Sequence, residues 1–157
     1  MIKIDKIIEN TESVDAQIRG ITLLSADEVK LYYKEIKVIE ETWWLCTEGT
    51  LSNTAVVVHS DGYIYYPGCF FDTELGVRPA LIISDCDFLN IGDRFIVAGY
   101  HWTMISDRLA LCDDIIGKTY FKSLLTTRDK GYNNYTNSDI KEWLWDWYNK
   151  NIEMKEF

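Results

Sequence analysis

One β-hairpin restricts the fold of this chain more than any other feature. Two apolar runs, 55–59 and 63–66, flank Ser60-Asp61-Gly62. A three-residue loop with Gly in the left-handed backbone region closes such a hairpin. In this register His59 lies opposite Tyr63 and Val58 lies opposite Ile64. We therefore expect an antiparallel sheet built around this hairpin.

The two faces of the hairpin should differ, because side chains alternate along a strand. The face that we expect to lie in the core carries Val56, Val58, Ile64 and Tyr66. The face that we expect to form an aromatic outer surface carries Val57, His59, Tyr63 and Tyr65.

Further strands are predicted on both sides of the hairpin. They comprise the isoleucine-rich run 2–8, the run 43–46, the run 76–83 (GVRPALII), and a meander of 94–98, 101–105 and 109–112. The segment 21–24 is a short apolar run. The meander should turn at Gly99-Tyr100 and Asp107-Arg108. Pro79 cannot donate to a β-ladder, so the run 76–83 should lie at a sheet edge or contain a bulge.

Two helices are predicted from cap and periodicity signals. Ser25 with Glu28 three residues later forms a capping box, and the buried face that follows comprises Val29, Tyr32, Tyr33 and Ile36. The second helix should start from a cap at Thr136 or Asn137 and reach about Lys150. Its predicted buried face comprises Ile140, Trp143, Leu144 and Trp147, with Trp145 and Tyr148 pointing elsewhere. Two helices among many short strands indicate an α+β fold.

Length and charge limit the domain count and the partners. A chain of 157 residues fits one domain. The net charge of −9, without a cluster of Lys and Arg, argues against nucleic acid and anionic membranes as partners.

No run of the sequence approaches the roughly 20 apolar residues of a membrane span. The first ten residues lack the apolar run of a signal peptide, so we expect a cytoplasmic protein, or one released in a phage particle.

No metal, cofactor or disulfide is predicted. The cysteines, at positions 46, 69, 86 and 112, form no C-x-x-C pair, and the chain has only two histidines. The acidic residues that could bind calcium are Glu40, Glu41, Asp85, Asp87, Asp113 and Asp114, and we expect them to lie in solvated loops. No Ser or Cys has a context that suggests a nucleophile with its base, so no catalytic residue is predicted.

Several segments together resemble one known family. They are the helix that follows Leu23-Leu24-Ser25, Trp43-Trp44-Leu45, the Ser60-Asp61-Gly62 hairpin, the run GVRPAL at 76–81, the segment from Ile91-Gly92-Asp93 to Trp102, and NNYTNSDIKEW at 133–143. They are similar to a bacterial and phage family of domains of unknown function with the motifs WWLRSPG, V-x-S-D-G, GVRPAL and SDIRKWL. The resemblance covers nearly the whole chain. It implies a C-type-lectin-like fold, distantly similar to formylglycine-generating enzymes and phage receptor-binding proteins, and it implies no activity.

This chain departs from the family pattern in two ways. The Arg, Ser and Pro of WWLRSPG are here Cys46, Thr47 and Glu48, so any role of that Arg is lost. The segments that come first in the family come last here, with a junction between half-domains near 84–90. This order suits a circular permutation within one domain, residues 1–157, or two chains that exchange halves as a dimer. We favour the permuted monomer.

The function predicted from these features is a non-enzymatic binding module, of phage or prophage origin, for a protein or a glycan. Its candidate contact residues are His59, Tyr63, Tyr65, Phe70, Phe71 and Trp145. A structural protein that acts through oligomerisation is one alternative. A formylglycine-generating type of oxidase is another, although it would need a reactive cysteine pair with a metal. We expect Arg78 to be structural, paired with a carboxylate or with carbonyls, rather than an anion ligand.

Overall fold

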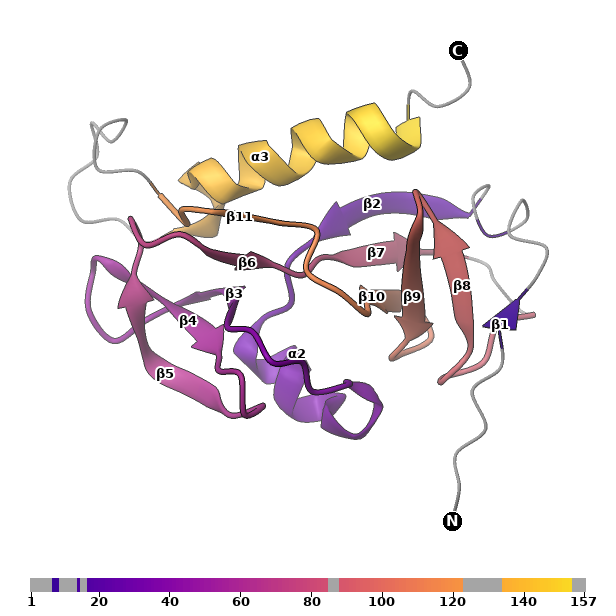
Figure 1. Ribbon diagram of the computed structural model, residues 1–157, viewed down its shortest axis with the longest axis horizontal. Helices are drawn as coiled ribbons and strands as arrows, with labels where there is room; N and C mark the ends of the chain where they lie inside the picture. Colours follow the sequence, from indigo (N-terminus) through magenta and orange to yellow (C-terminus); the bar gives the residue numbers. More distant parts are fainter. Residues whose placement is uncertain (1–6, 9–13, 15–16, 85–87, 123–133, 154–157) are drawn as a thin grey trace.

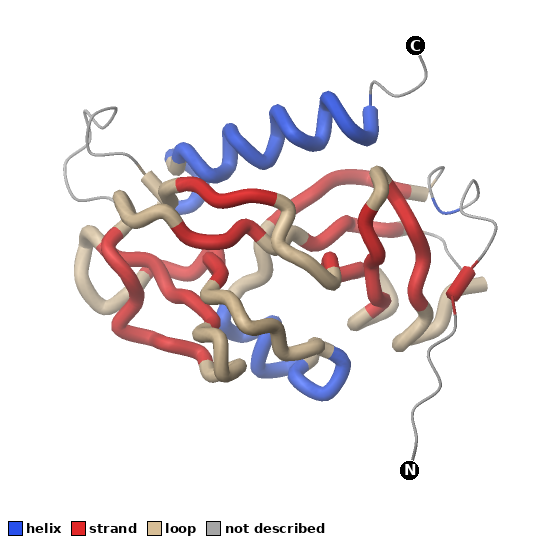
Figure 2. The backbone as a smooth tube through the Cα atoms, in the orientation of Figure 1, coloured by secondary structure: helices blue, strands red, loops and turns tan. Residues whose placement is uncertain are grey.

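The fold is α+β, with two mixed sheets and two α-helices in the part of the chain that the structure describes (Figures 1 and 2). The computed structural model describes residues 7–8, 14, 17–84, 88–122 and 134–153. The six-stranded sheet has the order β1 (Ile7–Ile8), β8 (Arg94–Val97), β9 (Tyr100–Met104), β10 (Leu109–Cys112), β7 (Ala80–Ile83) and β2 (Ile18–Thr22). The five-stranded sheet has the order β11 (Gly117–Thr119), β6 (Leu75–Val77), β3 (Trp43–Glu48), β4 (Thr54–Val58) and β5 (Ile64–Phe70).

Most strand pairs are antiparallel, as the sequence predicts, but β1 pairs with β8 and β3 with β6 in parallel. The predicted meander forms β8, β9 and β10, and its first turn lies one residue earlier than expected, at Ala98-Gly99, where both residues have positive φ. Strand β11 is not predicted by the sequence, because its three residues are too few to show an alternation of apolar and polar side chains. Of the predicted strand 2–8, the structure describes only β1.

Helix α2 (Ala26–Leu31) starts at the predicted capping box. The Ser25 hydroxyl accepts from the Glu28 N–H at 3.1 Å, and the Glu28 carboxylate accepts from the Ser25 N–H at 2.8 Å. The helix ends at Tyr32 and a 3₁₀ turn follows, η1 (Tyr33–Glu35). The predicted buried face is therefore wrong at Tyr33, which is exposed because the tighter turn rotates it away from Val29.

Helix α3 (Asp139–Tyr148) lies along one side of the molecule in Figure 1 and continues into a π-helical turn, η3 (Asn149–Glu153). Its cap is Ser138, after the short turn η2 (Tyr135–Asn137), and not Thr136 or Asn137. Its fully buried side chains are Ile140, Leu144 and Tyr148. Trp143 and Trp147 are only partly buried, and the prediction that Tyr148 points elsewhere is wrong, because the buried stripe follows an i, i+4, i+8 spacing.

The predicted hairpin forms with the predicted register. Val58 pairs with Ile64, the His59 N–H donates to the Tyr63 carbonyl at 2.9 Å, and Gly62 has a φ of +88°. The face assignment is wrong at two positions: Val57 is buried and Tyr66 is exposed. Strand β4 is covered on both faces, which buries Val57. A bulge in β5 after Tyr65, opposite the step from Ala55 to Val57, ends the alternation before Tyr66.

Gly68 makes this bulge possible, and we expect Gly68→Ala to lower the free energy of unfolding by about 2–3 kcal/mol. Its φ is +80°, and a Cβ there would lie 2.5 Å from the Ala55 carbonyl oxygen. Gly99 is the matched control, since its φ is +81° with no atom within 4 Å of the same Cβ. Gly99→Ala should therefore cost only the backbone strain, about 1 kcal/mol. Urea denaturation measures both, and equal losses would contradict the steric role of Gly68.

The run 76–83 breaks at Arg78-Pro79, where the chain passes from the five-stranded to the six-stranded sheet. The expected single strand at a sheet edge or with a bulge is therefore wrong: Pro79 lies between two strands, and both β6 and β7 are interior strands of their sheets. Strands β2 and β7 precede the 84–90 junction yet pair in the same sheet as β8 to β10, while β11 follows it and pairs with β6. The two halves of the sequence are therefore interleaved in both sheets.

Helix α3 packs on the five-stranded sheet of the same chain. Ile140 and Leu144 share one buried cluster with Trp44, Val77 and Phe121. Within the described ranges, no helix is both long enough and apolar enough to cross a bilayer.

Candidate functional site

The hairpin brings three of the predicted contact residues together. His59 and Tyr65 have ring centroids 4.7 Å apart with planes inclined by 50°. Tyr63 lies opposite His59 and is 72% exposed, and Tyr65 is 40% exposed. The turn itself is held by the Asp61 carboxylate, which accepts from the Tyr63 N–H at 3.0 Å. The predicted aromatic outer face is therefore present at His59, Tyr63 and Tyr65.

Two more aromatic side chains are exposed on β5, which is an edge strand of its sheet. In the register with β4, Phe70 lies opposite Thr54, on the sheet face of Val56 and Val58, whereas Tyr65 lies opposite Val57 on the other face. Tyr66 is 48% exposed and Phe70 is 56% exposed. We call the four exposed side chains of Tyr63, Tyr65, Tyr66 and Phe70 the aromatic strip. Sequence reasoning missed Tyr66, because only the bulge turns it outward. The dipeptide Pro67-Gly68 is the signal that could have indicated this bulge.

His59 lies beside the strip, but two other predicted contact residues lie away from it. Phe71 is buried, since its N–H donates to the Asn53 carbonyl at 2.9 Å and its ring joins the cluster of Trp44 and Phe121. The prediction of Phe71 as a contact residue is wrong for that reason. Trp145 is exposed, but it stacks on Tyr148 at 5.7 Å on α3, which Figure 1 places across the molecule from β5.

A second site, not predicted from the sequence, is a groove beside η1. It consists of two hollows, of about 300 and 500 Å³, and Lys34 and Glu35 are among the lining residues of both. We call it the η1 groove. The residues that line the smaller hollow are Lys34, Glu35, Ile36, Lys37, Gly92, Arg94, Thr103 and Asp113. Those that line the larger one are Lys30, Leu31, Tyr32, Tyr33, Lys34, Glu35, Ile91 and Ile105.

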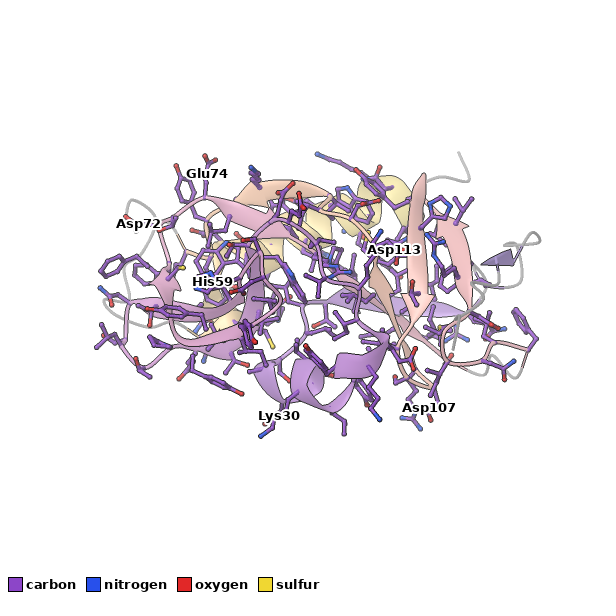
Figure 3. All side chains as sticks on the ribbon, turned by 60° about the horizontal axis from the view of Figure 1, so that its bottom comes forward. Lys30, His59, Asp72, Glu74, Asp107 and Asp113 are labelled. Atoms are coloured by element: carbon purple, nitrogen blue, oxygen red, sulfur yellow. The ribbon has the colours of Figure 1, made fainter. Side chains whose placement is uncertain are left out.

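Asp113, labelled in Figure 3, lines the smaller hollow of the η1 groove and is buried. One carboxylate oxygen accepts from Nε and Nη2 of Arg94 at 2.9 and 2.7 Å, and the other accepts from the Thr103 hydroxyl at 2.6 Å. The prediction that Asp113 lies in a solvated loop is therefore wrong. Periodicity could not reveal this network, because its members come from three different strand ends.

Arg78 lies behind the groove and is buried. Its Nε donates to the Cys112 carbonyl at 2.7 Å, its Nη1 donates to the Lys37 carbonyl at 2.9 Å, and its guanidinium lies 4.9 Å from the centre of the Trp43 ring. Burial lowers the pKa of Arg78 to about 10, with the nearby charges opposing that shift, so it stays charged at neutral pH. The prediction that Arg78 pairs with carbonyls is confirmed.

The cysteines that the structure describes, Cys46, Cys69 and Cys112, are free thiols, and Cys86 lies outside the described residues. Burial raises the pKa of Cys46 to about 11 and that of Cys112 to about 12, and it also raises the pKa of Cys69. These three therefore stay protonated at neutral pH and are weak nucleophiles.

Among the described residues no group of three or more His, Cys, Asp or Glu could hold a metal ion.

Comparison with known proteins adds no relative. No family model, no curated protein and no solved structure matches this chain. The resemblance to the C-type-lectin-like family therefore rests on the sequence motifs alone.

The two surfaces differ in the chemistry that they offer. The aromatic strip presents large, rigid rings along a strand edge and suits contact with another surface. The η1 groove is concave, is lined by lysines and exposed apolar side chains, and suits a smaller ligand.

Proposed function

We propose that this chain is a non-enzymatic binding module, of phage or prophage origin, that contacts a protein partner through the aromatic strip and His59. The observation that carries the proposal is the exposure of four aromatic side chains on one edge strand. Exposed tyrosines supply large contact areas at a low cost in side-chain entropy. They are also enriched among the interface residues that contribute most of the binding free energy.

The surroundings of the strip support a protein rather than a glycan as the partner. Leu51, three residues before Thr54 at the start of β4, is exposed, and Thr54 pairs with Phe70 in the backbone ladder. At the other end Val38 is exposed and lies against Gly62. A surface that mixes aromatic and aliphatic side chains favours the apolar core of a protein interface.

We also infer that the fold is C-type-lectin-like with its segments in permuted order in one chain. Three motifs of the resemblance coincide with elements: the tryptophan pair starts β3, the Ser60-Asp61-Gly62 turn joins β4 to β5, and SDIKEW caps and starts α3. In this arrangement α3 packs against the cluster of Trp44 within the chain, and sedimentation of the chain alone distinguishes the permuted monomer from a dimer with exchanged halves.

The double variant Tyr63→Ala/Tyr65→Ala is expected to weaken partner binding by about 30-fold or more, because two ring contacts near the centre of an interface are lost. The partner is first isolated by affinity capture from a host lysate, and its affinity is then measured by calorimetry with purified proteins. A glycan array and sedimentation of the chain alone are run in parallel.

Tyr120→Ala is the matched control, since Tyr120 is also 40% exposed but follows β11 at the other edge of the sheet. It should leave the affinity unchanged. Equal losses for both variants would contradict the role of the strip. Binding to the glycan array that is lost when Tyr63 is replaced would identify the partner as a glycan and contradict a protein partner. Self-association lost in the double variant would favour the assembly alternative.

A further inference from the structure

We propose that the η1 groove binds a small organic anion with an apolar body, such as an aliphatic carboxylate. This site is separate from the aromatic strip and does not depend on the function proposed for it. Its walls come from η1 and the residues beside it and from residues 91–94 and 103–105; Figure 1 labels α2, β8 and β9, the elements nearest to these segments in the chain.

The charged end of the groove has an excess of positive charge. Lys34 and Lys37 line the smaller hollow, and within the described ranges neither takes part in an ion pair. Both carboxylate oxygens of Asp113 are already engaged by Arg94 and Thr103. Glu35 is the one other carboxylate among the lining residues that the structure describes. In a chain with a net charge of −9, such a local excess of lysines favours an anion.

The other end of the groove adds apolar side chains to the charged ones of Lys30, Lys34 and Glu35. Leu31, Tyr33 and Ile91 line the larger hollow and are all exposed, while Ile105 lies buried beneath them. Large apolar side chains that face a concave hollow gain free energy when a ligand removes them from water. A ligand that fits both ends must therefore carry its negative charge at one end and apolar carbon at the other.

Both walls of the groove are fixed to the sheets, so the site exists before a ligand arrives. The Lys37 carbonyl accepts from buried Arg78, which also donates to Cys112. On the opposite wall the Gly92 N–H donates to the Met104 carbonyl at 2.8 Å. A preformed site loses little entropy on binding. The volumes of about 300 and 500 Å³ fall in the range typical of small-molecule sites.

The test uses hexanoate, acetate and hexylammonium as probes, with binding followed by amide chemical shifts of the ¹⁵N-labelled chain. Hexanoate should shift the amides of Lys34, Gly92 and Thr103 in a saturable manner. It should bind about tenfold or more tightly than acetate, because its additional methylene groups become buried. Hexylammonium has the same apolar body with the opposite charge, and it should bind at least about tenfold more weakly than hexanoate.

Two variants separate the two ends of the site. Lys34→Ala/Lys37→Ala should weaken hexanoate binding about fivefold or more, whereas Lys141→Ala/Lys150→Ala removes the same charge from α3 and its extension and should change nothing. Ile91→Ser should weaken hexanoate but not acetate. The proposal is overturned if hexylammonium binds as well as hexanoate, if both lysine pairs have the same effect, or if no probe gives a saturable shift at these amides.

Discussion

Replacing Trp44 by Ala is expected to lower the free energy of unfolding by about 3–5 kcal/mol. The Trp44 side chain is fully buried in strand β3. Its Nε1–H donates to the Thr119 carbonyl at 3.0 Å, and its ring lies 5.5 Å from that of Phe121. The variant loses the ring, leaves a cavity between the five-stranded sheet and α3, and leaves a carbonyl of β11 without its donor.

Two further variants divide this loss into its parts. Trp44→Phe keeps most of the ring but removes the hydrogen bond to Thr119, so it should cost about 1–2 kcal/mol. Trp145→Ala removes an exposed ring from α3 and should change stability by no more than about 0.5 kcal/mol. Unfolding in urea is monitored by far-ultraviolet circular dichroism, because each variant removes a tryptophan and so changes the intrinsic fluorescence of the protein. A loss below about 1 kcal/mol for Trp44→Ala would contradict the packing of α3 on β3.

The features that the sequence predicts correctly are those determined by residues close together in the chain. The hairpin register follows from Ser60-Asp61-Gly62, because Gly62 can adopt the positive φ that the turn requires. The start of α2 follows from Ser25 and Glu28, whose reciprocal hydrogen bonds span three residues. Three members of the candidate site, His59, Tyr63 and Tyr65, follow from the same local register.

The predictions that fail depend on residues distant in the chain. Phe71 follows an exposed aromatic in sequence, but its N–H and its carbonyl bond to Asn53 and to Lys122, which draw it into the core. Asp113 is acidic and follows a strand, as many loop residues do, yet Arg94 and Thr103 hold it from β8 and β9. Neither outcome can be derived from local periodicity, since each requires the pairing order of the strands.

The η1 groove could not be predicted for the same reason. One wall comes from η1 and the segment up to Lys37, and the other from residues 91–94 and 103–105, more than fifty residues later. The sequence shows lysines and an aromatic pair after a short helix, which is also the composition of an ordinary solvated turn. Only the closing of the two sheets around Arg78 brings the walls together.

Replacing Arg78 by Met is expected to lower the free energy of unfolding by about 3–5 kcal/mol. Met fills part of the space, but it leaves the buried carbonyl of Cys112 and the partly buried carbonyl of Lys37 without their donor, and each such loss costs about 1–3 kcal/mol. The variant also loses the contact of the guanidinium with the ring of Trp43. Arg78 is therefore a link between three segments, near residues 37, 43 and 112, rather than an anion ligand.

The matched control is Arg108→Met, which removes an exposed arginine from the turn between β9 and β10 and should cost no more than about 0.5 kcal/mol. Arg78→Lys retains the charge, but its single ammonium lacks the planar fork that reaches both carbonyls, so it should recover only part of the loss. Urea denaturation compares the three variants at pH 7. If Arg78→Met and Arg108→Met lost the same stability, the two carbonyl bonds would not fix the chain at Lys37, and the preformed wall of the η1 groove would lose its structural basis.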